Sequence, residues 1–338
     1  MRELVIVIAD LYLPADPGAA SRVPAPRDLA GLACFTRWGA REPLTHGWRA
    51  WLGAWLGRAE LAGIAPARIA AAVYPQLVGT QETMWLAVPV HLSAGLSRVH
   101  LAAAGLLYLQ DEELARLAQD FAHAFAGSGF SLTPASPREL LLLTPGVPAV
   151  ATQEPARFAG AEVNEALPRG PAAAGLRRTW TETEMWLHAL PWNQARGIPV
   201  TALWPWGALG ASALPAPDAA HAGPRALATD AYVRGLWHIC GFSCQAPPAD
   251  LGGVLGSMDG GRTVLVVEAG NLPKDSAGGF GAALGELDAR YLSPAVAALR
   301  AGRLDLLRLI ANDRCLTLKR RSHWQVWRPV VPVLAGLA

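Results

Sequence analysis

The chain has 338 residues, of which 52% are hydrophobic and only 17% are charged, a composition that excludes an intrinsically disordered protein. Its 29 basic and 27 acidic residues leave a net charge of +2, so no strong overall field attracts nucleic acid. No apolar run is long enough for a membrane span, and no targeting segment is recognisable, so the expected compartment is the cytoplasm. A chain of this length is expected to bury a large core and to divide into more than one lobe.

The first predicted element is a strand over residues 3–9, which is apolar throughout after Glu3. A continuous apolar run of this kind is typical of a strand covered on both faces, as in a parallel sheet between helices. Asp10 follows at the carboxyl end of the strand, the edge of an open α/β sheet at which ligands bind. Asp10 is therefore either a carboxylate of a metal or phosphate site, or a capping residue of the turn before Pro14.

An amphipathic helix with an aromatic stripe is predicted after a proline-rich loop. Its apolar residues recur at helical spacing, at Trp48, Trp51, Leu52, Trp55 and Leu56. Thr45 is the predicted N-cap. Because backbone N–H groups at a helix start favour a phosphoryl group, Thr45 is also the one candidate nucleophile, with simple capping as the alternative.

Residues 79–150 are predicted to form a separate lobe of the strand–helix–strand type. Its elements are expected at residues 84–90, 111–126 and 139–143. The remaining residues, 1–78 and 151–338, are assigned to a main domain that contains the first strand.

Alternating helices and strands are predicted again in the second half of the chain. The helices are expected at residues 182–186, 229–240 and 281–299, the first capped by Thr179 or Thr181 and the last broken near Pro294. The strands are expected at residues 263–267, 304–310, 315–319 and 324–327, the last two joined by a solvated basic turn. This alternation predicts an α/β fold with a covered, mostly parallel sheet. The sequence contains neither a glycine-rich nucleotide-binding loop nor a serine-hydrolase elbow, which disfavours conventional nucleotide enzymes and serine hydrolases.

The most distinctive stretch runs over residues 186–207 and holds four tryptophans. It contains an apolar helix end, two prolines that force irregular backbone, and a short buried strand. Irregular backbone usually lies at a surface or a cleft because its polar groups need partners. The stretch is therefore either a packed corner or a ligand-facing wall, and His188, Asn193 and Arg196 are the candidates for binding a small anionic ligand or a protein partner.

This stretch resembles the central motif of archaeal-type cofactor-independent phosphoglycerate mutases. The motif runs as an apolar helix end, His-Pro-x-Asn, an Arg, and an apolar-Trp-x-Trp-Gly strand, and it is matched here by Leu187 to Asn193, Arg196-Gly197 and Leu203 to Gly207. The closest match is to the bacterial branch of RpfE-type regulatory proteins. The resemblance implies an alkaline-phosphatase-like core, with the α+β lobe of residues 79–150 as its insertion.

Active members of this family hold two divalent metals, usually manganese or zinc, beside a Ser or Thr nucleophile. Two adjacent metals clamp the attacking and leaving oxygens, so a full set of His and carboxylate ligands is needed. By resemblance, Asp10 matches the first-strand ligand, Asp313 the first member of an Asp-His pair, and His323 the last His.

Other positions of this metal set are altered. Arg314 stands where the His of the pair should be, and an Arg there is a fixed cation in place of a metal ligand. The family's Asp-x-x-x-His falls on Asn271 to Asp275. The resemblance therefore implies a non-catalytic regulatory or binding protein with a degenerate metal site and no cofactor.

The alternative is a metal-dependent phosphomutase or phosphatase with a rearranged two-metal site. Asp10, Asp275, Asp313 and His323 would be its ligands, because an Asp in place of a His still binds a hard metal. Manganese or zinc would then be the cofactor.

Overall fold

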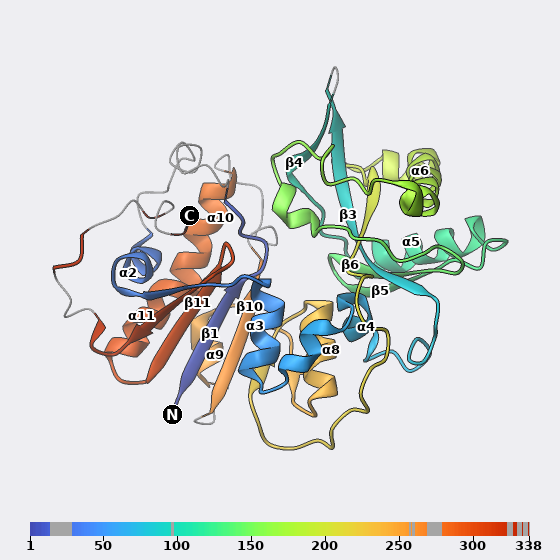
Figure 1. The fold of residues 1–338 in the computed structure, drawn as a ribbon. Coiled ribbons are helices and arrows are strands. Elements are labelled where there is room, and N and C mark those ends of the chain that lie inside the picture. The colour runs from blue at the N-terminus through green and yellow to red at the C-terminus, as the bar shows by residue number, and fades with distance from the viewer. Residues whose placement is uncertain are drawn as a thin grey trace. The chain divides into compact units, whose positions relative to one another are not determined.

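The structure is a computed structural model. It describes residues 1–13, 29–95, 98–256, 258, 261–268, 279–322, 327–329, 333 and 337. The chain divides into two compact units (Figure 1). The first contains Met1–Ala59, Ala219–Thr229 and Cys240–Ala338, and the second contains Glu60–Asp218 and Asp230–Ile239.

The first unit is built on a sheet that has seven strands in the described chain, in the order β2-β12-β11-β1-β10-β8-β9. These strands are β1 (Glu3–Ile8), β2 (Ala40–Pro43), β8 (Arg225–Leu227), β9 (Cys244–Gln245), β10 (Arg262–Val267), β11 (Leu306–Ala311) and β12 (Arg314–Lys319). Neighbours from β11 to β9 pair in parallel, whereas β12 pairs antiparallel with both β11 and β2. The prediction of an α/β fold with a mostly parallel sheet is confirmed.

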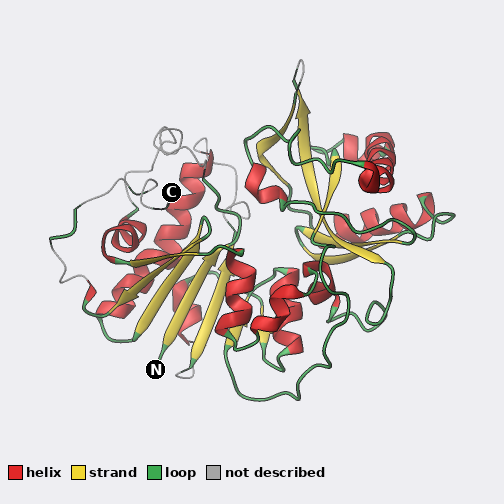
Figure 2. Ribbon diagram, viewed as in Figure 1, coloured by secondary structure: helices red, strands yellow, loops and turns green. Residues whose placement is uncertain are grey.

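The central strand β1 is buried along its whole length, as the continuous apolar run predicted. One face, at Leu4, Ile6 and Ile8, belongs to a single hydrophobic cluster with four helices (Figures 1 and 2). These helices are α2 (Ala30–Trp38), α9 (Leu251–Gly256), α10 (Gly279–Leu287) and α11 (Ser293–Arg300). On the other face, Glu3 Oε1 accepts a hydrogen bond of 3.2 Å from the indole Nε1 of Trp55 in α3 (Gly47–Trp55).

Two helices of the first unit differ from the sequence predictions. The N-cap residue of α3 is His46, and no side chain caps the helix, so the prediction of Thr45 as N-cap is wrong. The helix predicted over 281–299 is α10 and α11 joined by a π-helical turn, Asp288–Leu292. The carboxylate of Asp288, 1% exposed, accepts hydrogen bonds from the backbone N–H groups of Gly31 (3.0 Å) and Leu32 (2.7 Å). These are first-turn donors of α2, so a buried carboxylate satisfies the start of that helix.

The second unit is built on a separate, antiparallel sheet. Its strands in the described chain are β3 (Thr83–Ala94), β4 (Val99–Leu106), β5 (Ser131–Ser136), β6 (Glu139–Thr144) and β7 (Ala202–Trp206). Strand β3 pairs with β4, β6 and β7, and β6 also pairs with β5. The predicted strands at 84–90 and 139–143 are therefore present, whereas β4 and β5 had not been predicted.

The helices of the second unit lie on this antiparallel sheet and against one another. They are α4 (Pro66–Ala71), α5 (Asp111–Ala124), α6 (Ala174–Ala189), α7 (Pro191–Gln194) and α8 (Ala231–Ile239), with 3-10 turns at Ala59–Gly63, Pro155–Phe158 and Pro171–Ala173. Trp85 and Ala87 of β3 share one hydrophobic cluster with α5 and α6. Helices α4 and α8 approach so closely that a Cβ on Gly235 would collide with the carbonyl oxygen of Ile69.

Strand β7 makes the second unit larger than the lobe of residues 79–150 drawn from the sequence. The register runs from Leu86 opposite Trp206 to Val90 opposite Ala202, so the tryptophan-rich strand completes the antiparallel sheet. Residues 151–218 therefore belong to the same compact unit as residues 79–150.

Candidate ligand site in the second unit

The predicted central motif forms a corner that Asn193 holds together. Helix α6 ends at Ala189, α7 follows, and the chain then turns into β7. Asn193 is 2% exposed; its Nδ2 donates to the carbonyl oxygens of Leu187 (2.9 Å) and Val200 (2.8 Å), and its Oδ1 accepts the N–H of Val200 at 2.8 Å. Both amide protons are thereby used, and the helix end is tied to the segment that leads into the strand.

Two tryptophans of the motif, Trp186 and Trp204, pack against other aromatic rings. Trp204 lies edge-on to Trp180 with centroids 5.2 Å apart, and Trp186 meets Phe121 in the same way at 5.5 Å. The indole Nε1 of Trp204 donates to the carbonyl oxygen of Gln153 at 2.8 Å. The Trp204 ring is buried while its polar atom is satisfied, as expected of a packed corner.

Arg196 is engaged within the protein. Its guanidinium forms an ion pair with Glu113 of α5, and its Nε donates to the carbonyl oxygen of Ile198 at 3.3 Å. Partial burial lowers the pKa of the Arg196 guanidinium from its usual value. The side chain therefore joins α5 to the corner.

A pocket of about 430 Å³ opens at this corner. It is lined by Glu184, His188, Asn193, Gln194, Pro199, Val200 and Thr201. Glu184 and His188 stand one turn apart on α6, so their side chains share a helix face. The structure thus brings together two of the three predicted ligand-binding residues and adds a carboxyl group.

The polar groups of this pocket differ in what they already bind. Thr201 Oγ1 donates to the carbonyl oxygen of Val90 (3.2 Å) and accepts the N–H of Leu92 (2.6 Å). Gln194 Nε2 donates to the carbonyl oxygen of His188 at 2.6 Å. In contrast, the imidazole ring of His188 has neither a hydrogen bond nor an ion pair with any described residue.

Glu184 combines burial with a single hydrogen bond. Its Oε1 accepts the indole N–H of Trp180 at 2.8 Å, which leaves Oε2 available. Burial raises the pKa of the Glu184 carboxyl, and the hydrogen bond from Trp180 opposes this rise. Glu184 was not predicted as a site residue from the sequence, although its spacing of four from His188 in a predicted helix was a usable signal.

Three of the candidate metal and nucleophile residues, Asp10, Asp313 and Thr45, lie at the carboxyl edge of the parallel sheet in the first unit. Asp10 follows β1 and Asp313 follows β11, and these strands pair in parallel with Val7 opposite Ile310. The N–H of Leu44 donates to the carbonyl oxygen of Asp313 at 2.7 Å, so Thr45 lies at the same edge.

A third acidic residue, Glu268, follows β10 and had not been singled out from the sequence. The N–H of Ala9 donates to the carbonyl oxygen of Val267 at 2.9 Å, which places Glu268 at the same edge as Asp10. Among the described residues, no three His, Cys, Asp or Glu side chains are arranged to hold a metal ion. Asp275, the neighbouring Asn271 and His323 lie outside the described residues.

Arg314, which stands where the resemblance places a metal-binding His, is held by backbone. Its Nε donates to the carbonyl oxygen of Leu337 at 3.1 Å, and Asn312 Nδ2 donates to the same oxygen at 2.7 Å. Asn312 and Asp313 have φ values of 50° and 52°, and they form the two-residue turn between β11 and β12. Asn and Asp tolerate this left-handed conformation better than other non-glycine residues.

Comparisons with known proteins include the following two distant structural similarities. One is to a cofactor-independent phosphoglycerate mutase from Thermoplasma acidophilum DSM 1728, at 13% identity and a TM-score of 0.42 over 100% of this chain and 95% of that chain. The other is to the PH0037 protein from Pyrococcus horikoshii, at 11% identity and a TM-score of 0.48 over 94% of this chain and 87% of that chain. No protein-family model and no curated protein matches the chain. At these TM-scores neither structure assigns the chain to a family.

None of the helices in the described part of the chain is both long and apolar enough to cross a membrane.

Proposed function

We propose that the chain is a non-catalytic, phosphoglycerate-mutase-like binding protein that takes a small anionic ligand in the pocket beside His188. The observation that carries this proposal is the pocket of about 430 Å³, in which the His188 imidazole has no partner among the described residues. In this proposal the parallel sheet is an alkaline-phosphatase-like core, the protein acts in the cytoplasm as a regulatory protein of the RpfE type, and its metal site is degenerate.

The polar groups of the pocket can bind an anion. The His188 imidazole has a ring N–H that donates to an anionic oxygen. The Glu184 carboxyl, whose pKa is raised by burial, takes up a proton more readily than an exposed glutamate and then donates instead of repelling. Because an ionised Glu184 repels an anion, affinity is expected to rise as the pH is lowered and this carboxyl takes up its proton.

The test is calorimetric titration of the full chain with inorganic phosphate and with 3-phosphoglycerate at pH 6 and pH 8. His188→Ala should weaken binding about tenfold or more, the value of a lost charge-assisted hydrogen bond. His123→Ala is the matched control, because His123 is exposed on α5 of the same unit. Equal affinities of the two variants, or tighter binding at pH 8, would contradict the proposal.

The anchoring of Arg314 supports a degenerate metal site. Its guanidinium is held by the carbonyl oxygen of Leu337, and it begins β12 next to Asp313. A cation fixed beside a candidate ligand opposes the binding of a divalent metal there.

The second candidate function, a metal-dependent phosphomutase or phosphatase using manganese or zinc, has one observation in its favour. Asp10, Asp313 and Thr45 lie at one edge of the parallel sheet, where α/β enzymes bind ligands. Metal content of the full chain after dialysis against manganese distinguishes the two functions. Stoichiometric metal that Asp10→Ala removes would favour the enzyme over the binding protein.

A further inference from the structure

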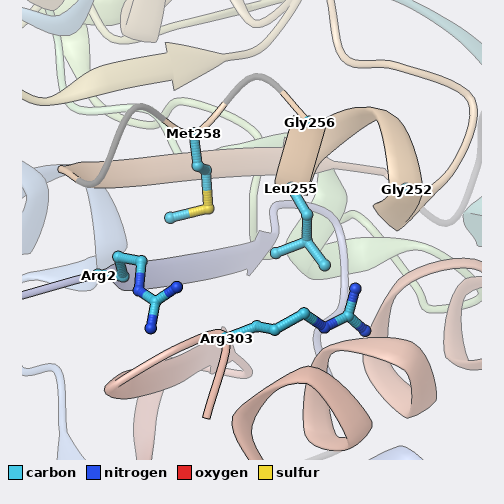
Figure 3. Close-up of a pocket in the computed structure, with 6 residues that line it drawn as sticks. All are labelled: Arg2, Gly252, Leu255, Gly256, Met258 and Arg303. Atoms are coloured by element: carbon cyan, nitrogen blue, oxygen red, sulfur yellow. The ribbon is translucent and has the colours of Figure 1, made fainter. Parts of the chain in front are cut away.

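A second cavity, of about 320 Å³, lies in the first unit and is independent of the proposed function. It is lined by Arg2, Gly252, Leu255, Gly256, Met258 and Arg303 (Figure 3). Arg2 directly precedes β1 and Arg303 lies shortly before β11, and these strands pair in parallel with Glu3 opposite Leu306. The cavity is therefore at the amino edge of the sheet, at the opposite end of the strands from Asp10 and Asp313.

Two guanidinium groups, those of Arg2 and Arg320, lie against Gly302, and Arg303 follows Gly302 in the chain. Arg2 Nη2 donates to the carbonyl oxygen of Gly302 at 2.6 Å, and Arg303 is the next residue in the chain. The Cζ of Arg320 lies 3.1 Å from the position that a Cβ on Gly302 would take. We call Arg2, Arg303 and Arg320 the Gly302 arginine cluster.

No ion pair joins this cluster to any described carboxylate. The Arg303 and Arg320 guanidiniums have no hydrogen-bond partner among the described residues either, and Arg2 binds only a carbonyl oxygen through its side chain. Asp305 is the acidic residue in contact with the cluster, and its Oδ2 accepts the backbone N–H of Arg2 at 2.7 Å. A guanidinium without an acidic partner is available to an anionic group.

The opposite wall of the cavity is apolar. Figure 3 shows the side chains of Leu255 and Met258 extending into the space that faces Arg2 and Arg303. Gly252 and Gly256 add no side chains to this wall, so the cavity stays open beside α9. A ligand that fits both walls carries an anionic group at one end and a compact apolar group at the other.

We propose that this cavity binds a small phosphate monoester with an apolar substituent. The guanidiniums of Arg2 and Arg303 bind the phosphate oxygens, because their planar donors match that geometry in a bidentate way. Leu255 and Met258 cover the apolar substituent. The same chemistry is present in a free metabolite and in a phospholipid headgroup, and the cavity volume of about 320 Å³ favours the free molecule.

The test uses phenyl phosphate, inorganic phosphate and phenol, each titrated calorimetrically into the full chain. Phenyl phosphate should bind about tenfold more tightly than inorganic phosphate, because the ring leaves water, and phenol alone should not bind. Arg303→Ala should weaken phenyl phosphate binding about tenfold or more, and Arg303→Lys should restore part of the loss.

Arg290→Ala is the matched control, because it removes the same charge from an exposed position elsewhere in the first unit. His188→Ala should leave unchanged the part of phenyl phosphate binding that Arg303→Ala removes, so failure of this proposal is distinct from failure of the proposed function. Equal losses in the Arg303→Ala and Arg290→Ala variants would overturn the proposal. Binding to phosphatidate-containing vesicles without binding of phenyl phosphate would also overturn it.

Discussion

Two regions were expected from the sequence to carry function, and they differ in which polar groups are already bound within the protein. At the corner of the second unit, Asn193 and Arg196 are bound within the protein, while His188 and Glu184 present free polar atoms to a pocket. At the carboxyl edge of the parallel sheet, Asp10 and Asp313 are aligned by strand pairing, and Asp313 also bonds Leu44 through its backbone.

A residue's place in a motif therefore does not reveal whether its polar atoms are available to a ligand. An Asn with two donors and an acceptor fits a ligand or an irregular backbone equally well. At Asn193 the side-chain amide is bound to backbone groups and is not available to a ligand. The polar atoms that are available belong to Glu184 and His188 on the neighbouring helix face. Substitutions can therefore distinguish residues that stabilise the fold from residues that bind a ligand in these two regions.

The largest effect is expected at Asn193. Asn193→Ala removes three buried hydrogen bonds to backbone, so the free energy of unfolding should fall by about 3 kcal/mol. Gln194→Ala, at an exposed neighbouring position, should cost less than about 1 kcal/mol. Urea unfolding monitored by tryptophan fluorescence measures both, and equal losses would show that Asn193 does not hold the corner.

A smaller effect is expected for the ion pair between Arg196 and Glu113. The side chains are 18% and 32% exposed, so the coupling free energy should be about 1 kcal/mol and should decline with salt. A double-mutant cycle of Arg196→Ala and Glu113→Ala measures it. A large loss of anion binding in Arg196→Ala at unchanged stability would instead make Arg196 a ligand residue.

Arg314→Ala is expected to have a weaker effect on stability. The Nε of Arg314 makes one hydrogen bond, to Leu337, so its loss should cost about 0.5–1 kcal/mol. Thermal unfolding of the full chain, with Arg321→Ala as a neighbouring control, checks this value. If Arg314→Ala gained stoichiometric manganese binding, the edge would be a blocked metal site and not a dismantled one.

The smallest effect is a pH dependence at Glu184. Burial raises the pKa of this carboxyl above its ordinary value of 4.5, so the folded state holds its proton to higher pH than the unfolded state. The favourable contribution to stability is therefore complete below about pH 4.5 and is lost as the pH rises through the folded pKa. Glu184→Gln should flatten this part of the stability profile, and Glu182→Gln, at an exposed position of the same helix, should not.

The elements that the sequence predicted best are those with a complete local pattern. Beyond their first residues, strands β1 and β10 are continuous apolar runs, and β11 is apolar except for Arg308, because both faces of these strands are covered. Helix α5 was predicted within a few residues because its acidic first turn and its apolar spacing agree.

Elements that depend on distant pairing were missed. Strand β4 is rich in alanine, and β5 contains Pro134 and two serines, so neither has a strong β propensity. Strand β5 exists because β6 pairs with it. Helix α6 begins at Ala174, well before the predicted start, because no side chain caps it and its first turn carries no apolar pattern.

The candidate site was predictable in part. The motif indicated the right corner, since His188 and Asn193 both line the pocket there. The motif did not indicate that the Asn193 amide would bind the backbone of Leu187 and Val200. Those backbone groups come close to Asn193 only because the chain turns at α7. The position of β7 in the antiparallel sheet was likewise set by pairing with β3 and not by its own sequence.

The central claim is that ligand chemistry lies at the His188 pocket and that the carboxyl edge performs no metal-dependent turnover. The most direct measurement is hydrolysis of p-nitrophenyl phosphate by the full chain in added manganese, with Asp10→Ala as the matched variant. The expected result is the same background rate for both proteins. A rate well above background in the full chain, abolished by Asp10→Ala while the variant remains folded, would contradict the claim.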